Sequence, residues 1–118
     1  GGIVGQAHRG IRGIDALAKY KEGLQMNFEW DENKNQINQR KHGISFEEAQ
    51  AVFEDEHAIL FDDPDHSESE ERFLLIGLDR KTRVCIVSHC YRGTDETIRI
   101  ISARKATKLE RSVYDEQF

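Results

Sequence analysis

The chain has 118 residues, a length typical of one domain and too short for two separate cores. Its composition is 37% hydrophobic and 33% charged with one proline, which excludes disordered and fibrous proteins, and no apolar run reaches the ~18 residues of a membrane span. We therefore expect a soluble globular domain without a membrane segment, with a formal net charge of -5.

The first 25 residues differ from the rest of the chain. They hold six of the nine glycines and precede the only methionine, Met26. They lack the uninterrupted apolar core of a signal peptide. We interpret residues 1–25 as a leader or extension and expect the folded domain to span residues 26–118. A short amphipathic helix near residues 14–22 is the alternative.

The domain is predicted to begin with a strand at residues 27–30 and a helix at residues 32–42. Asp31 is a good N-cap for this helix, and Gly43 is a natural C-cap. Ile37 is its only aliphatic core residue, so one face is a polar stripe. That stripe consists of Lys34, Asn38, Lys41 and His42. A solvated surface helix is the ordinary interpretation, but this many donors on one side favours a binding role.

A second helix is predicted after Ser45, which forms a capping box with Glu48 and precedes an apolar face. A short strand at residues 58–61 and an acidic loop at residues 62–71 follow. The loop carboxylates could suggest a divalent metal, but the spacing of a calcium loop is missing. We therefore expect no metal and no other cofactor.

Three strands, at residues 72–78, 83–91 and 97–103, are separated by short turns and predict an antiparallel meander. The last strand runs directly into a closing helix. The order of elements predicts an α+β fold: a short N-terminal strand, two helices, an antiparallel sheet meander and a C-terminal helix. Cys85 and Cys90 would point to opposite faces of one strand, so we expect reduced thiols in a cytoplasmic protein and no zinc site.

The charges are segregated along the chain. Residues 43–71 contain eleven acidic residues and no Lys or Arg, whereas residues 72–114 contain ten Lys or Arg and four acidic residues. A cationic face can attract a polyanion even when the whole molecule is acidic, because binding responds to the local potential.

The meander predicts a constellation of basic side chains. A tight turn at residues 79–82 would place Arg72 opposite His89, and Arg99 joins them in only one register of the next hairpin. Arg104 and Lys105 are predicted in the first turn of the last helix, where cations gain nothing from the helix dipole, so an anion would complete the site. The ordinary alternatives are a salt bridge from Arg99 to the acidic segment at residues 43–71 and a core position for His89.

Basic strands beside a basic helix suit RNA cleavage without a metal. This chemistry needs a base for the 2′-hydroxyl proton, an acid for the leaving 5′-oxygen and cations for the charge that develops on phosphorus. His89 is the candidate acid or base, and Arg72, Arg99 and Arg104 are the candidate electrostatic clamp. The candidate RNA-binding residues are Lys34, Asn38, Lys41, His42 and Lys105.

Three segments carry a resemblance to a known family: FEWDENKNQINQRKHGISFEEAQAVF, DDPDHSESEERFLLIGL and IRIISARKATKLERSVYDE. In this order they resemble the BrnT family of ribonuclease toxins from type II toxin-antitoxin systems. The matching motif positions are Lys34, Asn38, Lys41, His42, Arg72, Arg99 and Arg104. The resemblance implies a RelE-like fold, RNA cleavage that arrests growth, and a BrnA-like antitoxin. It also implies that the antitoxin has a DNA-binding domain and that the complex represses its own operon.

Two other functions remain as alternatives. A non-catalytic module could use the same basic face to bind nucleic acid or an acidic protein. A metal-dependent nuclease could use the carboxylates of residues 62–71. If the chain is a toxin, we expect the antitoxin to cover the cationic groove and thereby exclude RNA.

Overall fold

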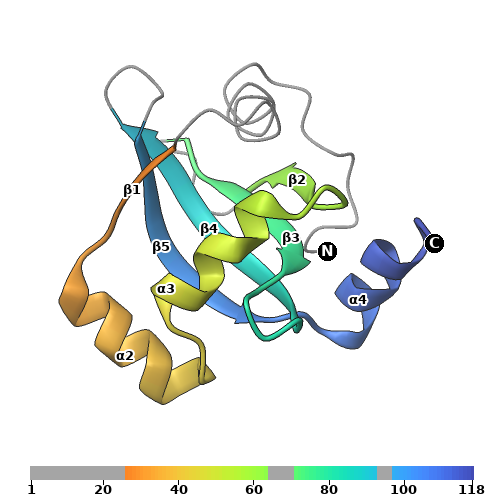
Figure 1. Cartoon of the computed structure of the whole chain (residues 1–118), viewed down its shortest axis with the longest axis horizontal. Helices are drawn as coiled ribbons and strands as arrows, with labels where there is room; N and C mark the ends of the chain where they lie inside the picture. Colours follow the sequence, from red (N-terminus) through yellow and green to blue (C-terminus); the bar gives the residue numbers. More distant parts are fainter. Residues whose placement is uncertain (1–25, 64–70, 93–96) are drawn as a thin grey trace.

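The computed structural model describes residues 26–63, 71–92 and 97–118, so the predicted leader at residues 1–25 lies outside the described residues. One sheet of five strands forms in the order β1-β5-β4-β3-β2 (Figure 1). The strands are β1 (Asn27–Glu29), β2 (Ile59–Asp62), β3 (Phe73–Leu78), β4 (Val84–Arg92) and β5 (Thr97–Lys105). The helices are α2 (Glu32–His42), α3 (Phe46–Ala49), the 3₁₀ helix η1 (Gln50–Glu54) and α4 (Lys108–Asp115). Within these ranges, no helix is long and apolar enough to cross a membrane.

The predicted α+β fold is confirmed, and the sheet is mixed. β2, β3, β4 and β5 form the antiparallel meander, while β1 pairs in parallel with β5. That parallel pairing covers only the first three residues of β5, Thr97 to Arg99. The backbone of β5 beyond Arg99 is therefore left without a neighbouring strand on that side.

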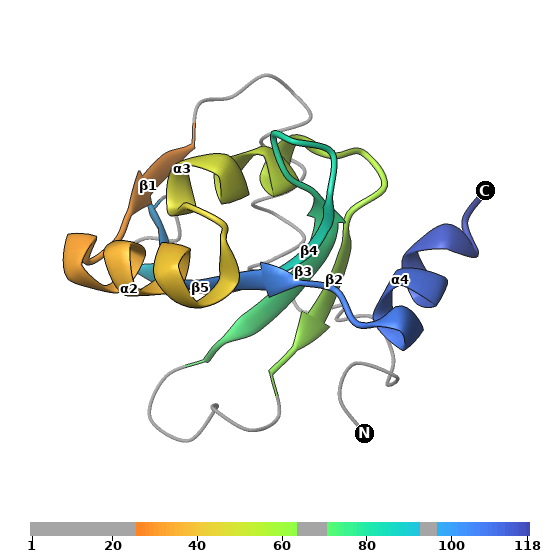
Figure 2. The same ribbon diagram turned by 90° about the horizontal axis from the view of Figure 1, so that it is seen from below.

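Helices cover both faces of the sheet. α3 and η1 pack on one face, where Phe46, Phe53 and Ile98 belong to the larger hydrophobic core. Tyr114 of α4 packs on the other face, in a smaller cluster with Ile86. Figure 2 shows α3 and α4 apart from each other, with the strands between them. α2 covers neither face, and lies beside β5.

The first helix has the predicted caps and an unexpected interior. The Asp31 side chain accepts hydrogen bonds from backbone N–H groups of the first turn, and Gly43 ends the helix in the left-handed conformation with φ 72°. The residues that α2 buries are Asn35 and Asn38, whereas Ile37 is 53% exposed. The prediction that Ile37 anchors this helix was therefore wrong, because amide hydrogen bonds and not apolar contacts attach it to the sheet.

The turn between β3 and β4 is one residue longer than predicted. Asp79 N–H donates to Arg83 O, and Thr82 follows as the last of three turn residues with φ 60°. The Asp79 carboxylate accepts hydrogen bonds from the backbone N–H groups of Lys81 and Arg83. This longer turn shifts the register, so His89 is opposite Phe73 and not opposite Arg72.

The junction of β5 and α4 also differs from the prediction. Arg104 and Lys105 are the last two residues of the strand, and α4 begins at Lys108 after its N-cap Thr107. Glu110 completes a capping box with Thr107. The argument that Arg104 and Lys105 crowd a helix N-terminus was therefore wrong.

Candidate active site

The side chain of Asn38 closes the open edge of β5. Its Oδ1 accepts a hydrogen bond from Ala103 N–H at 3.1 Å, and its Nδ2 donates to Ala103 O at 2.8 Å and to Ile44 O at 2.9 Å. The amide thus takes the place of a neighbouring strand and holds α2 against the sheet edge. Asn38 is buried and its Nδ2 makes both of its hydrogen bonds within the chain, yet the residue also lines the pocket between α2 and β5, so its role in RNA binding stays a prediction.

A pocket of about 190 Å³ lies where α2 meets β5. It is lined by Lys34, Ile37, Asn38, Lys41, His42, Ile101 and Ser102. Ile37 and Ile101 give the pocket an apolar wall, while Lys34 and Lys41, about two helical turns apart on α2, bring two positive charges. An apolar surface beside fixed cations suits a ligand that combines a flat ring with an anionic group.

The pKa of His42, which lines this pocket, lies below its ordinary value of 6.5. Burial lowers its pKa first, and the positive charges of Lys41 and Arg104 lower it further. The imidazole is therefore mainly neutral at neutral pH and can accept a proton. The side chain is half-buried, so a ligand in the pocket can reach it.

Arg104 is held by a carboxylate of its own chain. Its Nη1 and Nη2 donate to the two carboxylate oxygens of Glu110 at 2.7 and 2.9 Å. This pair lowers the pKa of Glu110 and raises that of Arg104. The anion predicted to complete the site is thus Glu110, which sequence reasoning missed. The capping-box spacing from Thr107 to Glu110 was the available signal.

Arg99 lies at the far end of β5 from Arg104. The five residue steps from Arg99 to Arg104 correspond to roughly 16 Å along a strand. Arg99 Nη1 donates to Glu29 Oε2 at 2.7 Å, so Arg99 does form a salt bridge, but with a carboxylate of β1 and not with the acidic segment at residues 43–71. The structure therefore does not bring these two arginines into one clamp.

Arg72 lies nearer to Arg99 than to the pocket. It precedes β3, is half-buried, and its carbonyl accepts a hydrogen bond from Asp63 N–H. The register of β3, β4 and β5, continued by one residue, aligns Arg72 with Cys90 and Arg99 on one sheet face. The catalytic roles of Arg72 and Arg99 stay predictions.

His89 lies on the opposite sheet face, inside the larger core. It is fully buried, and its ring centroid is 4.8 Å from that of Phe53. Its Nδ1 is 3.1 Å from Val87 O and its Nε2 is 3.3 Å from Tyr91 Oη. The prediction of His89 as the catalytic acid or base was therefore wrong, since RNA cannot reach it without opening the core. The one-residue shift at the β3–β4 turn explains the error.

The comparison with known proteins identifies the family of this chain. The family model described as "Ribonuclease toxin, BrnT, of type II toxin-antitoxin system" matches residues 30–110. This chain belongs to the BrnT family. It is also similar to the crystal structure of the Brucella abortus ribonuclease toxin BrnT, with 26% sequence identity and a TM-score of 0.52. That match covers 71% of this chain and 100% of the other, and no curated protein matches.

The matched span of this BrnT-family chain includes the pocket and all the predicted site residues. Lys34, Lys41 and His42, from the first motif, line the pocket. Of the acidic residues considered as metal ligands, Asp65, Glu68 and Glu70 lie outside the described residues. Within residues 26–63, 71–92 and 97–118, no group of three or more His, Cys, Asp or Glu is placed to hold a metal ion.

Burial of His89 predicts acid sensitivity of this BrnT-family fold. Burial lowers its pKa to about 4, below the ordinary value of 6.5. Between these values the unfolded chain binds the proton and the folded chain does not, so stability present above pH 6.5 is lost as the pH falls toward 4. We expect the free energy of unfolding to fall by about 2 kcal/mol from pH 7 to pH 5 through this residue.

Urea unfolding of wild type and of His89→Phe at the two pH values measures this effect. Phenylalanine keeps a ring among the aromatic neighbours and removes the titration, so the variant should lose much less stability between pH 7 and pH 5. An equal loss in both proteins would contradict the assignment to His89.

Proposed function

We propose that this member of a ribonuclease toxin family is a metal-independent endoribonuclease whose scissile phosphate binds in the pocket between α2 and β5. Cleavage of RNA would arrest growth. The observation that carries the proposal is the pocket itself, where a neutral histidine and two lysines lie beside apolar surface. Family membership supports the RNA substrate and the toxin role.

The proposed reaction is transfer of the phosphodiester to the neighbouring 2′-oxygen. Neutral His42 accepts the proton of the 2′-hydroxyl, and the oxygen attacks phosphorus. The bond from phosphorus to the 5′-oxygen breaks, which leaves a 2′,3′-cyclic phosphate. The departing oxygen takes a proton from the imidazolium of His42 or from water, so the products are a cyclic phosphate end and a 5′-hydroxyl end.

The cations of the site stabilise the charge that develops in this reaction. Lys34 and Lys41 line the pocket and can contact the phosphate oxygens directly. Arg104 acts at a distance through its positive charge. Its guanidinium is bound by Glu110, and its charge lowers the pKa of His42. Ile37 and Ile101 offer apolar contact to a base next to the scissile phosphate.

A pair of neighbouring substitutions on α2 tests the pocket. Lys41 lines it, whereas Arg40 is exposed and does not. Lys41→Gln should weaken RNA binding about tenfold, since it removes a charged contact to phosphate, and Arg40→Gln should leave binding nearly unchanged. Fluorescence anisotropy with a labelled RNA measures both. Equal effects of the two variants would exclude the pocket as the RNA site.

Cleavage in the presence of EDTA tests the enzymatic part of the proposal. Wild-type protein should degrade RNA with the chelator present. Loss of activity on chelation would favour the metal-dependent nuclease, and binding without cleavage would favour the non-catalytic module.

We also propose that a BrnA-like antitoxin with a DNA-binding domain neutralises the toxin by covering this pocket, and that the complex represses its own operon through that domain. The positive charge around the pocket supports an acidic antitoxin segment as the inhibitor. The cytoplasmic location expected from the two thiols stays a prediction; both cysteines are buried.

A further inference from the structure

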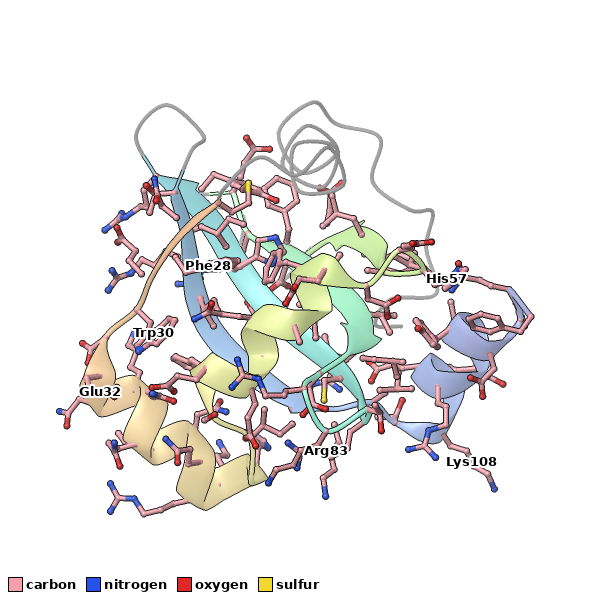
Figure 3. The ribbon with its side chains drawn as sticks, viewed as in Figure 1. Phe28, Trp30, Glu32, His57, Arg83 and Lys108 are labelled. Carbon is pink, nitrogen blue, oxygen red and sulfur yellow. The ribbon has the colours of Figure 1, made fainter. Side chains whose placement is uncertain are left out.

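Three segments that are distant in sequence meet at one edge of the molecule. Arg83 Nη1 donates to Gly43 O, which joins the β3–β4 turn to the end of α2. Ala106 N–H donates to Val84 O, which joins the connection between β5 and α4 to the start of β4. Figure 1 shows these segments along its lower edge, and Figure 3 places Arg83 and Lys108 there.

This edge, which we call the basic edge, is dominated by positive charge. It consists of Lys41, His42, Arg80, Lys81, Arg83, Arg104, Lys105, Lys108 and Arg111. Its carboxylates are already bound within the fold: Asp79 by Arg83, Glu48 by Lys81, and Glu110 by Arg104. The charges that remain at the surface are therefore positive.

Four cations of the basic edge lie outside the pocket and have no acidic partner. They are Arg80, Lys105, Lys108 and Arg111, all of them exposed. In the described part of the chain none of the four forms an ion pair, whereas Lys81, Arg83 and Arg104 each do. Unpaired like charges that share one edge repel one another, and a polyanion would relieve that repulsion.

We propose that RNA extends beyond the pocket along the basic edge, so that Lys105, Lys108 and Arg111 bind backbone phosphates outside the scissile position. The inference rests on the proposed function, because the pocket sets the position of the scissile phosphate, and the rest of the bound strand extends from there. Continuity supports it: Arg104, whose charge acts on His42 in the pocket, forms a salt bridge with Glu110 of α4, the helix that carries Lys108 and Arg111. A single strand fits this edge better than a duplex, because the pocket has room for an unpaired base.

The length of the bound RNA provides the test. Proteins that follow a single strand with a cationic surface occupy about 4 to about 16 nucleotides. Two fluorescent RNAs of these lengths, with every 2′-hydroxyl methylated to prevent cleavage, are titrated with wild-type protein and with K108Q/R111Q. The control is R40Q/R92Q, which also loses two positive charges. Arg40 is exposed on α2, and Arg92 is the last residue of β4, at the opposite end of that strand from the basic edge.

The long RNA should bind wild type more tightly than the short one. In K108Q/R111Q the affinity for the long RNA should fall about tenfold, and the slope of log K against log salt should become shallower by about 1.4. The affinity for the short RNA, and both affinities of R40Q/R92Q, should stay close to wild type.

Three results would overturn the inference. If wild type binds both lengths equally, the basic edge carries no RNA, and the proposed function is unaffected. If it binds neither, the proposed function fails as well. If K108Q/R111Q weakens binding of polyglutamate and not of the long RNA, the edge docks an acidic protein.

Discussion

Replacement of His42 by glutamine is expected to lower kcat/KM for RNA cleavage by about 10²–10⁴-fold, the range over which a positioned proton-transfer group contributes. The pocket places this histidine beside two lysines, and burial keeps it neutral. Glutamine keeps a polar side chain of similar reach and cannot accept the 2′-hydroxyl proton. RNA affinity should change much less than the rate, because Lys34 and Lys41 stay in place.

The pH profile identifies the same residue independently of the substitution. A base must be neutral to act, so kcat/KM should rise with pH through the pKa of His42, which lies below the ordinary 6.5. Lys41 is one cause of that lowered pKa. Lys41→Gln should therefore move the rising limb to higher pH, an effect that a purely structural role of Lys41 would not produce.

His57 provides the matched control. It is an exposed histidine between η1 and β2, and Figure 3 shows it on the other side of the molecule from Glu32 at the start of α2. His57→Gln should cleave RNA at the wild-type rate. If His42→Gln also cleaves at that rate, proton transfer must come from another group, and Arg72 and Arg99 become the next positions to substitute.

Local sequence signals predicted the elements of this fold well. The caps Asp31, Gly43 and Ser45 lie where the sequence places them, because a cap depends on residues within one turn of each other. The α2 motif also brought Lys34, Lys41 and His42 together, since helical spacing alone puts them on one side.

Predictions that depended on register failed. A three-residue turn in place of a two-residue turn placed His89 opposite Phe73 instead of Arg72, and a strand that continued through Lys105 moved Arg104 away from the helix start. One residue reverses the face of a whole strand, and the sequence of the turn did not determine its length. Periodicity could not reveal the salt bridge of Arg104 with Glu110, which joins a strand to a helix.

The role of Asn38 was hidden for a different reason. A polar residue on a helix with almost no apolar face predicts solvent exposure, and the sequence contains no sign that β1 ends after three pairs with β5. Only the topology shows an edge that needs hydrogen-bond partners. The amide that supplies them is therefore part of the fold as well as part of the pocket lining.

Asn38→Ala should lower the free energy of unfolding by about 3 kcal/mol or more, measured by urea unfolding. The substitution leaves Ala103 N–H, Ala103 O and Ile44 O without their partner, and each buried orphan costs about 1–3 kcal/mol. The better helix propensity of alanine offsets well under 1 kcal/mol of this loss. Asn33→Ala is the control, because Asn33 is exposed on the same helix.

Asn38→Asp separates the hydrogen bonds from the packing. Aspartate has nearly the shape of asparagine, but it would direct a carboxylate oxygen at the carbonyl oxygens of Ile44 and Ala103, which now accept from Nδ2. We expect it to destabilise the fold at least as much as alanine does, since two acceptors are then opposed by a charge. A loss below about 1 kcal/mol in both variants would mean that water can replace the amide at this edge. In that case α2 could separate from β5 without unfolding the sheet, and the pocket would open and close with it.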